Sequence, residues 1–352
     1  MDMTAGRWVR FVGFMTAGWL LAAHATAGDE ATATPDATAA AAPVAVGANV
    51  ARLRFEPIGL SIPSPYTPGK VPVVFIPGLW MGPQFWDGTI RTLASDPALS
   101  AAYQFWTFGY ATQDPLAYSA YQLRTAIEEA RRRLDPEAKD PALDRMVLVG
   151  HSMGGVIARL AVVEAGDRFW RLASDQDAGL LTGGPGDVEL ARATLLFRPC
   201  STVRRVVFLA TPHRGGDTSQ RLLHDAARRL ALRPAPLADL FRRLAEANPP
   251  GYFKPSFFAG VTTSTDDLRH DSPLLAVLAG LSPPSSVSFH SIIAVKNGPM
   301  GPGGDDGLVS YDSAHLDGVA SELVAASSHF SCHNDPAALA EVRRILLENL
   351  DP

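Results

Sequence analysis

The residue of this sequence best placed for nucleophilic chemistry is Ser152. It lies in the pattern G-H-S-M-G, directly after the apolar run 146–149 and before the stretch 154–165, whose apolar residues recur at helical spacing. A strand, a sharp turn and a helix in this order hold the central serine in a strained backbone conformation, and small residues such as Gly150 and Gly154 avoid collisions there. The pattern therefore predicts a serine nucleophile at a helix N-terminus.

A serine hydroxyl is a weak nucleophile and needs a base, which must itself be held by a third group. His329 follows the apolar run 321–325 and a turn of small residues, and it precedes the last apolar stripe of the chain. This places it on the loop after the final expected strand, where a serine-acid-histidine order puts the base. We predict His329 as the base. His315 and His333 are the alternatives, although His333 better fits a helix-capping or surface position.

The acid that orients the base is expected between the serine and the histidine. A glycine-rich stretch, 303–307, follows the apolar run 287–295 and contains two adjacent aspartates. We choose Asp306 because it directly precedes a glycine and an apolar pair, with Asp305 as the main alternative. His151 adjoins the serine but would point away from its hydroxyl, so we expect it to pack beside the site.

Attack on a carbonyl creates an oxyanion, which requires two preorganised N–H donors, each worth about 3 kcal/mol of barrier. One is expected to be the backbone N–H of Met153, the residue after the nucleophile. The other should come from the loop after the apolar run 71–76, where Gly78 allows a close turn. The sequence predicts the Leu79 N–H as this donor, with Trp80 as the alternative.

Apolar runs and helical stretches alternate along most of the chain, and this alternation predicts the architecture. Strands joined by crossover helices pair in parallel, and a parallel sheet needs helices on both faces. We therefore expect an α/β fold with a mostly parallel central sheet, helices on both faces and a helical cap insertion. The expected strands are 71–76, 104–108, 146–149, 203–210, 287–295 and 321–325, and the clearest helices are 118–134 and 336–350.

Two stretches are longer than such a fold requires. Residues from about 215 to 286 are helical in pattern, punctuated by prolines and placed between two expected strands, where one helix would suffice. We interpret them as a cap or lid over the site and call them the cap insertion. The stretch 167–199 contains a Gly-Gly-Pro-Gly sequence and is expected to be a surface loop. Both belong to a single domain over residues 51–352.

The N-terminus has the features of an export signal. Arg7 and Arg10 precede the apolar run 11–23, and an Ala-Thr-Ala sequence follows it. The run is shorter than the roughly 20 residues of a membrane-spanning helix. We expect residues 1–27 to be a cleaved signal peptide and the mature protein to be periplasmic or secreted. Residues 28–50, rich in Ala, Thr and Pro, are expected to form a disordered linker.

Composition limits the partners. The chain has a formal charge of -5 at pH 7, which makes nucleic acid an unfavourable partner, and no spacing typical of metal ligands occurs, so we expect no metal. Cys200 and Cys332 are the two cysteines. They would lie at opposite ends of a strand about 20 Å long, too far apart for a disulfide, so we expect two free thiols.

Taken together, these pieces resemble the α/β-hydrolase superfamily, specifically secreted bacterial lipases and esterases and the related GPI-inositol-deacylase-like group. The resemblance covers about residues 70–350, and it implies ester hydrolysis by a triad of Ser152, Asp306 and His329 without an organic cofactor. The segments that carry it are 73–80, the serine turn, 210–215, 289–292, 306–309 and the region of His329.

The sequence also departs from this family pattern. Pro77 stands where many relatives have a histidine, and Phe330 is an extra residue directly after the predicted base. Some secreted bacterial lipases bind a structural calcium near the acid and base loops. Asp305, Asp312 and Asp317 are the carboxylates available here, and solvated side chains explain them equally well.

Aromatic residues gather where such a fold places its pocket, so we hypothesise a hydrophobic or lipid-like ester as substrate, with core packing as the alternative reason for them. A lipid-like substrate would also allow transient contact with a membrane surface. An acyltransferase with the same triad and a non-catalytic lipid-binding protein are the competing functions, and the oligomeric state stays open. The aromatic residues concerned are Trp80, Phe85, Trp86, Trp106, Phe108, Tyr110, Phe257 and Phe258.

Overall fold

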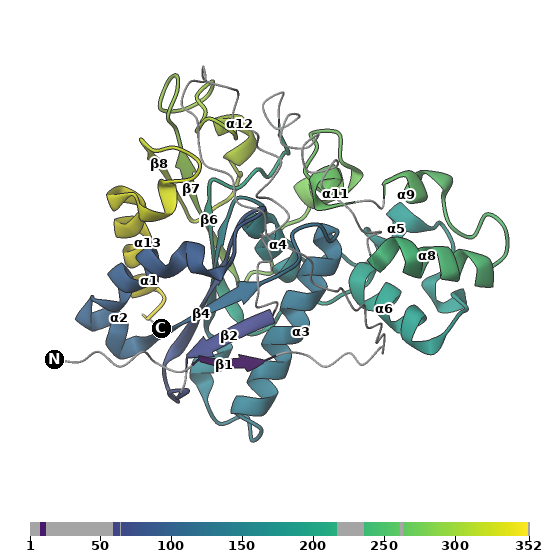
Figure 1. The fold of residues 1–352 in the computed structure, drawn as a ribbon, viewed down its shortest axis with the longest axis horizontal. Coiled ribbons are helices and arrows are strands. Elements are labelled where there is room, and N and C mark those ends of the chain that lie inside the picture. The colour runs from purple at the N-terminus through teal and green to yellow at the C-terminus, as the bar shows by residue number, and fades with distance from the viewer. Residues whose placement is uncertain (1–7, 12–58, 64, 217–235, 261–262, 351–352) are drawn as a thin grey trace, which may run out of the picture. The chain divides into compact units, whose positions relative to one another are not determined.

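The computed structural model describes residues 8–11, 59–63, 65–216, 236–260 and 263–350, and its central feature is one sheet of eight strands (Figure 1). The strand order is β1-β2-β4-β3-β5-β6-β7-β8. Strands β3 to β8 pair in parallel, whereas β1 and β2 extend the β4 edge in antiparallel orientation. The strands are β1 (Trp8–Phe11), β2 (Gly59–Pro63), β3 (Val71–Ile76), β4 (Tyr103–Gly109), β5 (Met146–His151), β6 (Val203–Leu209), β7 (Ser288–Ala294) and β8 (Ser321–Ala325).

Both faces of the sheet are buried. On β3, Val73 and Phe75 contribute to one apolar cluster, and Val74 and Ile76 contribute to another. This follows from the geometry of a strand, whose successive side chains point to opposite faces. All six residues of β3 are buried, so apolar layers must cover the sheet on both sides, as a mostly parallel sheet requires.

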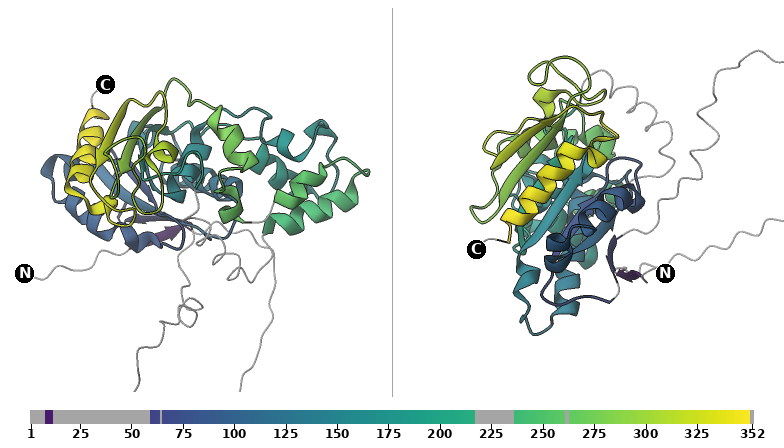
Figure 2. Two further views of the ribbon diagram at one scale, coloured as in Figure 1. Left: turned by 90° about the horizontal axis from the view of Figure 1, so that it is seen from above. Right: turned by 90° about the vertical axis from the view of Figure 1, so that its left-hand side faces the viewer.

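Five helices supply much of these layers. Helices α3 (Leu116–Leu134) and α4 (Met153–Val162) pack their apolar residues with Val74 and Ile76. Helices α1 (Asp87–Ala94), α2 (Pro97–Ala102) and α13 (Pro336–Glu348) pack against the other face, and Figure 2 shows α13 lying along the sheet. The predicted α/β architecture with helices on both faces is therefore confirmed.

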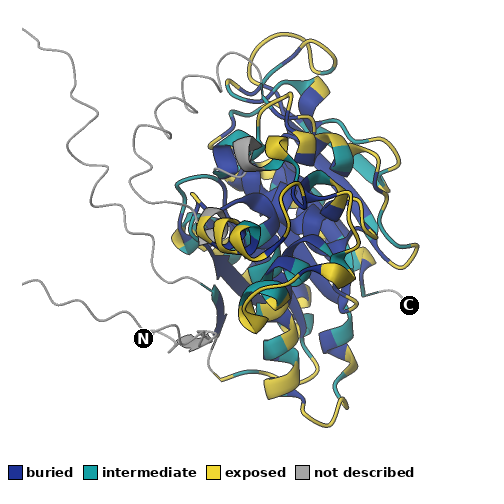
Figure 3. Cartoon of the chain, turned by 90° about the vertical axis from the view of Figure 1, so that its right-hand side faces the viewer, coloured by how far each residue is buried: buried dark blue, intermediate teal, exposed yellow. Residues whose placement is uncertain are grey.

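Shorter helical segments complete the described part of the chain. The α-helices are α5 (Trp170–Ala173), α6 (Pro185–Leu195), α8 (Pro236–Ala247), α9 (Pro255–Gly260), α10 (Ser264–Asp267), α11 (Pro273–Ala279) and α12 (Tyr311–Ala314). The 3-10 helices are η2 (Pro83–Trp86), η3 (Pro141–Asp144), η4 (Ala178–Leu180) and η5 (Cys332–Asn334). Buried residues concentrate in the strands and the inner helix faces, and exposed residues follow the loops (Figure 3).

The expectation of a surface loop over 167–199 is wrong. The stretch contains α5 and α6, and Phe169 and Trp170 are buried in the apolar core. Its Gly-Gly-Pro-Gly sequence ends the preceding turn and places Pro185 at the first position of α6. Proline is well suited to that position because its missing N–H would have no partner there. The sequence thus marks a helix start.

The cap insertion is helical where the structure describes it. Helices α8 to α11 lie within it, and residues 217–235 and 261–262 are outside the described residues. Helix α6 packs against α8, and α5 against α9, so helices of the stretch 167–199 and the first two described helices of the cap insertion form one group (Figures 1 and 2).

The expected linker, residues 28–50, lies outside the described residues, and so does most of the expected signal peptide. The described part of the latter is β1, which pairs with β2. Cleavage after residue 27 would leave a sheet that begins at β2. Within the described ranges, no helix is long and apolar enough to cross a membrane. Cys200 and Cys332 are both buried and free, as predicted.

Candidate active site

Ser152 lies on a sharp turn between β5, which ends at His151, and α4, which begins at Met153. Its backbone has φ 53° and ψ −125°, a conformation that costs energy for a residue with a side chain. The turn also brings main chains together so closely that a Cβ on Gly154 would lie 2.5 Å from the Pro77 carbonyl oxygen. Glycine is therefore required at position 154, and the strained serine is presented at the end of a rigid strand.

The structure brings Ser152, His329 and Asp306 together. His329 Nε2 lies 2.9 Å from Ser152 Oγ, and His329 Nδ1 lies 2.7 Å from Asp306 Oδ2. His329 and Asp306 are each 2 % exposed and Ser152 is 8 % exposed, so the chain of hydrogen bonds is shielded from water. A neutral imidazole that donates from Nδ1 to the carboxylate has Nε2 free to accept the hydroxyl proton.

Asp306 is itself held by its loop. Its Oδ1 accepts hydrogen bonds from the backbone N–H groups of Leu308 at 2.9 Å and Val309 at 2.7 Å, which leaves Oδ2 for the imidazole. The alternative acid, Asp305, has a different role: its Oδ1 accepts from Asn297 Nδ2 and from the Gly307 N–H. The geometry thus places Asp306, and not Asp305, against the histidine.

The two alternative histidines do not face the serine. His315 faces two carboxylates, which accept hydrogen bonds from its ring: Nδ1 lies 2.7 Å from Glu322 and Nε2 lies 3.2 Å from Asp317. Partial burial opposes its protonation, but the bonds to the two carboxylates outweigh burial and raise its pKa. His315 is therefore an element of a surface ion-pair network.

His333 was expected at a helix cap or at the surface, and this expectation is wrong. Its side chain is buried, and its ring lies tilted against Phe85 with 3.8 Å between ring centroids. Burial lowers its pKa to about 4, so it is neutral at neutral pH. Nothing in the sequence near His333 indicates this contact, because Phe85 lies about 250 positions earlier in the chain.

His151 packs beside the site, as predicted. It is fully buried, and its ring lies 4.9 Å from that of His329 and 4.8 Å from that of Phe85. Its Nε2 also makes a 2.8 Å hydrogen bond with the carbonyl oxygen of His329, a contact that sequence reasoning missed.

The loop after β3 lies against the serine turn. A Cβ on Gly78 would come within 3.1 Å of Ser152 Cβ, a tighter contact than most side chains make, so glycine favours this approach. Tyr110 donates a 2.8 Å hydrogen bond to the Pro77 carbonyl and so fixes the start of the loop. Leu79 and Trp80 follow directly, and Trp80 has a positive φ of 59°. Proline at position 77 is therefore compatible with a close loop here.

Four of the eight aromatic residues considered for an acyl pocket are buried in the core. Trp86, Trp106, Phe108 and Tyr110 are buried in the two main apolar clusters, so core packing accounts for them. Phe257 lines a cavity beside the cap helices, whereas the side chain of Phe258 is outside the described residues. Phe330, the extra residue, is 57 % exposed and meets the His329 ring edge to face.

A polar groove runs beside the acid loop. Asp305 and Asp312 line it together with Arg214, whose positive charge lies among the acidic side chains. In the part of the chain that the structure describes, no three His, Cys, Asp or Glu side chains are grouped as metal ligands. Asp305, Asp312 and Asp317 therefore do not form one metal-binding cluster in this structure.

The cap insertion is tied to the core at the start of α3. Asp267, in α10, accepts a 2.8 Å hydrogen bond from the Leu116 N–H at the start of α3. Ser264, from the same helix, donates to the Thr112 carbonyl. A carboxylate at the N-terminus of α3 gains from the unpaired N–H groups and the helix dipole. The sequence held no signal for this contact, which joins residues about 150 positions apart.

The Asp267 carboxyl should make stability depend on pH. Burial raises its pKa from the usual 3.8 to about 7. The folded state therefore holds this proton more tightly, so the group favours folding at low pH and this contribution is lost as pH rises from about 4 to 7. We expect Asp267→Asn to raise the free energy of unfolding, and this increase should be about 1 kcal/mol larger at pH 8 than at pH 4.5. The full pKa shift would correspond to a larger difference, but the residue is only partly buried and solvent weakens the effect.

Urea unfolding at the two pH values measures this difference. Asp271→Asn is a matched control, because the hydrogen bond from Arg269 lowers the pKa of this exposed carboxyl to about 2, below both pH values. The effect of that variant on stability should therefore be nearly the same at pH 8 and at pH 4.5. An Asp267→Asn effect that is the same at both pH values would contradict the prediction.

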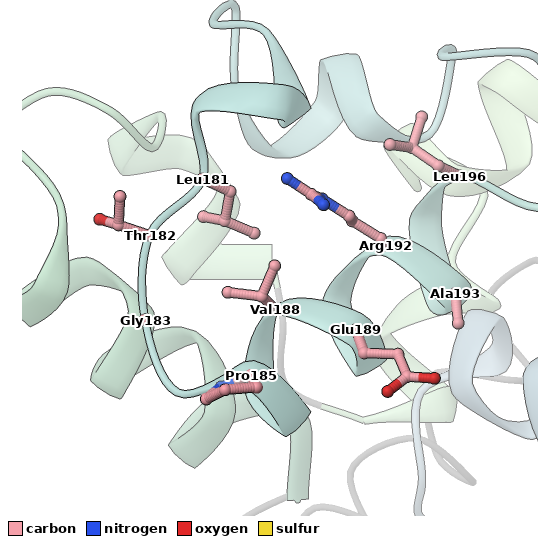
Figure 4. A pocket seen from close by; sticks show the side chains of 9 residues that line it. All are labelled: Leu181, Thr182, Gly183, Pro185, Val188, Glu189, Arg192, Ala193 and Leu196. Carbon is pink, nitrogen blue, oxygen red and sulfur yellow. The ribbon is translucent and has the colours of Figure 1, made fainter.

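Two hollows lie near the cap helices. One is a cavity of about 230 Å³, lined mainly by apolar side chains from the start of α3, from α5 and α6 and from the cap insertion. Its apolar residues include Ala117, Phe169, Leu172, Leu195, Phe241, Phe257 and Leu274. The other is an open groove along α6, where Leu181, Val188 and Leu196 surround the side chain of Arg192 (Figure 4). Neither hollow is lined by Ser152, Asp306 or His329.

Comparison with known proteins identifies the family. A model described as "Alpha/beta hydrolase family" matches residues 73–342, so the chain belongs to this family. No curated protein matches the sequence.

Similar solved structures include bacterial lipases at low identity. The propeptide form of the Bacillus licheniformis lipase BlEst2 is 14 % identical with a TM-score of 0.44, and the match covers 79 % of this chain and 49 % of that one. This chain thus spans about half the length of that structure. Lipase 1 from Pelosinus fermentans is 14 % identical (TM-score 0.46, 80 % and 98 % covered), and the Staphylococcus hyicus lipase is 13 % identical (TM-score 0.47, 80 % and 94 % covered).

Proposed function

We propose that this hydrolase is a serine ester hydrolase of the lipase or carboxylesterase type. The observation that carries the proposal is the buried chain of hydrogen bonds from Ser152 through His329 to Asp306, with distances of 2.9 and 2.7 Å. A serine on a strained turn, a base at its hydroxyl and an acid behind the base are the three parts that nucleophilic acyl transfer needs.

The geometry supports a two-step reaction. His329 Nε2 takes the proton from Ser152 Oγ as the oxygen attacks the ester carbon, and Asp306 stabilises the imidazolium that forms. The imidazolium then gives the proton to the leaving alkoxide, and an acyl-enzyme remains on Ser152. Water attacks this ester with His329 again as the base, which releases the carboxylic acid and restores the serine.

For the oxyanion we propose the backbone N–H groups of Met153 and Leu79 as donors, with Trp80 in place of Leu79 as the alternative. Met153 is the first residue of α4, so its N–H has no partner within the helix. The loop that carries Leu79 reaches the serine turn at Gly78, which supports a donor from this loop. Both groups are fixed by the fold before substrate binds, as electrostatic stabilisation requires.

A hydrophobic acyl group is the substrate feature that the cap cavity favours. An apolar cavity of 150 Å³ holds a molecule of benzene, so about 230 Å³ can take a larger apolar group. Ala117, at the start of α3, lines this cavity. Helix α3 follows β4, whose parallel pairing with β3 brings its carboxyl end to the same sheet edge as the serine turn.

Filling this cavity should change chain-length preference. We expect Ala117→Leu to lower kcat/KM for a long-chain p-nitrophenyl ester about tenfold, since the value of one methylene in a pocket is 1–3 kcal/mol, and to leave the acetate ester nearly unaffected. Ala193→Leu, which adds the same bulk in the groove along α6, is the matched control. If both variants behave alike across a panel of chain lengths, the cavity does not bind the acyl group.

Covalent labelling tests the proposed function directly. A fluorophosphonate should add one adduct to the folded protein, measured by intact mass, and peptide mapping should place it on Ser152. Absence of an adduct would favour the competing function, a non-catalytic lipid-binding protein. An acyltransferase would also be labelled but would pass the acyl group to an added alcohol faster than to water.

Export is part of the proposal. The basic and apolar N-terminal segment and the Ala-Thr-Ala sequence support cleavage after residue 27 and a periplasmic or secreted enzyme. N-terminal sequencing of the protein recovered from the cell envelope and the medium tests this, and a chain that still begins at Met1 would contradict it.

A further inference from the structure

We propose that His151 is a positioning residue that holds the main chain of His329 through a buried hydrogen bond from its imidazole Nε2–H. The proposal rests on the function proposed above and adds a fourth side chain to the site. It starts from the 2.8 Å contact between His151 Nε2 and the carbonyl oxygen of His329. A carbonyl oxygen only accepts, so the imidazole must donate from Nε2.

The contact completes the fixation of the base. The His329 N–H donates a 3.0 Å hydrogen bond to the Asp306 carbonyl, so the acid loop holds one end of this residue. The His329 carbonyl is held at the other end by His151, the last residue of β5, directly before Ser152. The main chain of the base is therefore tied to Asp306, with which its side chain pairs, and to His151, the residue directly before the serine.

Burial keeps the His151 imidazole in its neutral form. Desolvation, and after it the neighbouring His329, hold the pKa of His151 well below its usual range. The neutral ring adds no positive charge 4.9 Å from the ring that must accept a proton. With Nε2 protonated, its Nδ1 is left without a hydrogen, and this atom has no hydrogen-bond partner among the described residues.

The orientation of the His151 ring is also fixed. Phe85 lies 4.8 Å from it on one side, and Phe85 is backed by His333 at 3.8 Å. Toward the loop after β3, a Cβ on Gly78 would lie 3.0 Å from His151 Nδ1, so the main chain closes that direction. Because the ring is held on these sides, its Nε2–H stays directed at the His329 carbonyl oxygen, and no side-chain entropy is lost at each turnover.

Two amide variants distinguish a hydrogen-bond donor at position 151 from a side chain that only fills space there. The Nε2 of glutamine lies where the imidazole Nε2 of histidine lies, whereas the shorter asparagine places its amide near the position of Nδ1. We expect His151→Gln to keep kcat within about threefold of the wild type. We expect His151→Asn to lower kcat about 10- to 100-fold with little change in KM, because a displaced base affects the chemical step and not substrate binding.

Fold and function are monitored separately. Melting temperature and circular dichroism should show that both variants are folded, and His151→Phe, which keeps a ring but no donor, should resemble His151→Asn in kcat. Equal activity of the glutamine and asparagine variants, whether high or low, would overturn the proposal while leaving the hydrolase function intact.

A measurement independent of activity covers the remaining case, in which the wild type hydrolyses no ester and the proposed function fails. Nitrogen-15 NMR of histidine-labelled protein should show a ring protonated on Nε2, with a proton that exchanges slowly with solvent, and the His151→Gln variant should lack that signal. A ring at position 151 protonated on Nδ1 would overturn the proposal.

Discussion

Replacing Ser152 by alanine is expected to lower kcat for ester hydrolysis by about 10⁶-fold, with the fold retained. The substitution removes the oxygen that attacks the carbonyl, and in a triad the loss of the nucleophile costs about as much as the loss of all three members. A residual rate above the uncatalysed one should remain, because backbone donors still bind the oxyanion. Steady-state kinetics on a p-nitrophenyl ester, with fluorophosphonate labelling beside them, measure the loss.

The control is Ser328→Ala. Ser328 adjoins His329, but its Oγ lies 2.7 Å from Ser331 Oγ, and the ring nitrogens of His329 have Asp306 and Ser152 as their partners. Its removal should leave kcat within a few fold of the wild type. The fold itself should tolerate alanine at position 152, since the strained φ of 53° costs alanine about what it costs serine. If the Ser152→Ala protein kept one hundredth of the wild-type activity, Ser152 would not be the nucleophile.

The parts of the site that could be predicted from the sequence are those set by local pattern. Glycines flanking Ser152 between an apolar run and a helical stretch specify a turn, because no other residue type fits the contact of Gly154 with the end of β3. His329 was found from its place after the last strand, and the carboxyl ends of parallel strands share one sheet edge. Residues predicted in three separate loops therefore meet there.

Contacts between segments that are distant in the chain could not be predicted from a local sequence pattern. Strand β2 has only five residues and sits on the antiparallel side of the sheet, so its Leu60 and Ile62 gave too short an alternation to stand out. The contact between His333 and Phe85 joins the base loop to η2, and neither residue type specifies the other. A Gly-Gly-Pro-Gly sequence is compatible both with a surface turn and with the start of a helix. The sequence alone therefore does not predict α6.

Replacing Asp306 by asparagine is expected to lower kcat about 10⁴-fold without unfolding the protein. Two backbone N–H groups, those of Leu308 and Val309, point at Oδ1, so the amide NH₂ cannot occupy that side. It must therefore face His329 Nδ1 as a donor. The imidazole then accepts at Nδ1 and carries its proton on Nε2, where it can no longer take the proton of Ser152, and such a tautomer change costs about this factor in a triad.

Asp305→Asn is the matched control for this substitution and decides between the two adjacent aspartates. Its Oδ1 accepts from Asn297 Nδ2 and from the Gly307 N–H, and an amide oxygen can accept both bonds. We expect kcat of this variant to stay within a few fold of the wild type, because no bond to the imidazole changes. KM should move little in either variant, since neither carboxylate lines the apolar cavity beside the cap helices. Should Asp305→Asn lose more activity than Asp306→Asn, the carboxylate that the hydrogen bonds assign to His329 would not be the one that orients it during turnover.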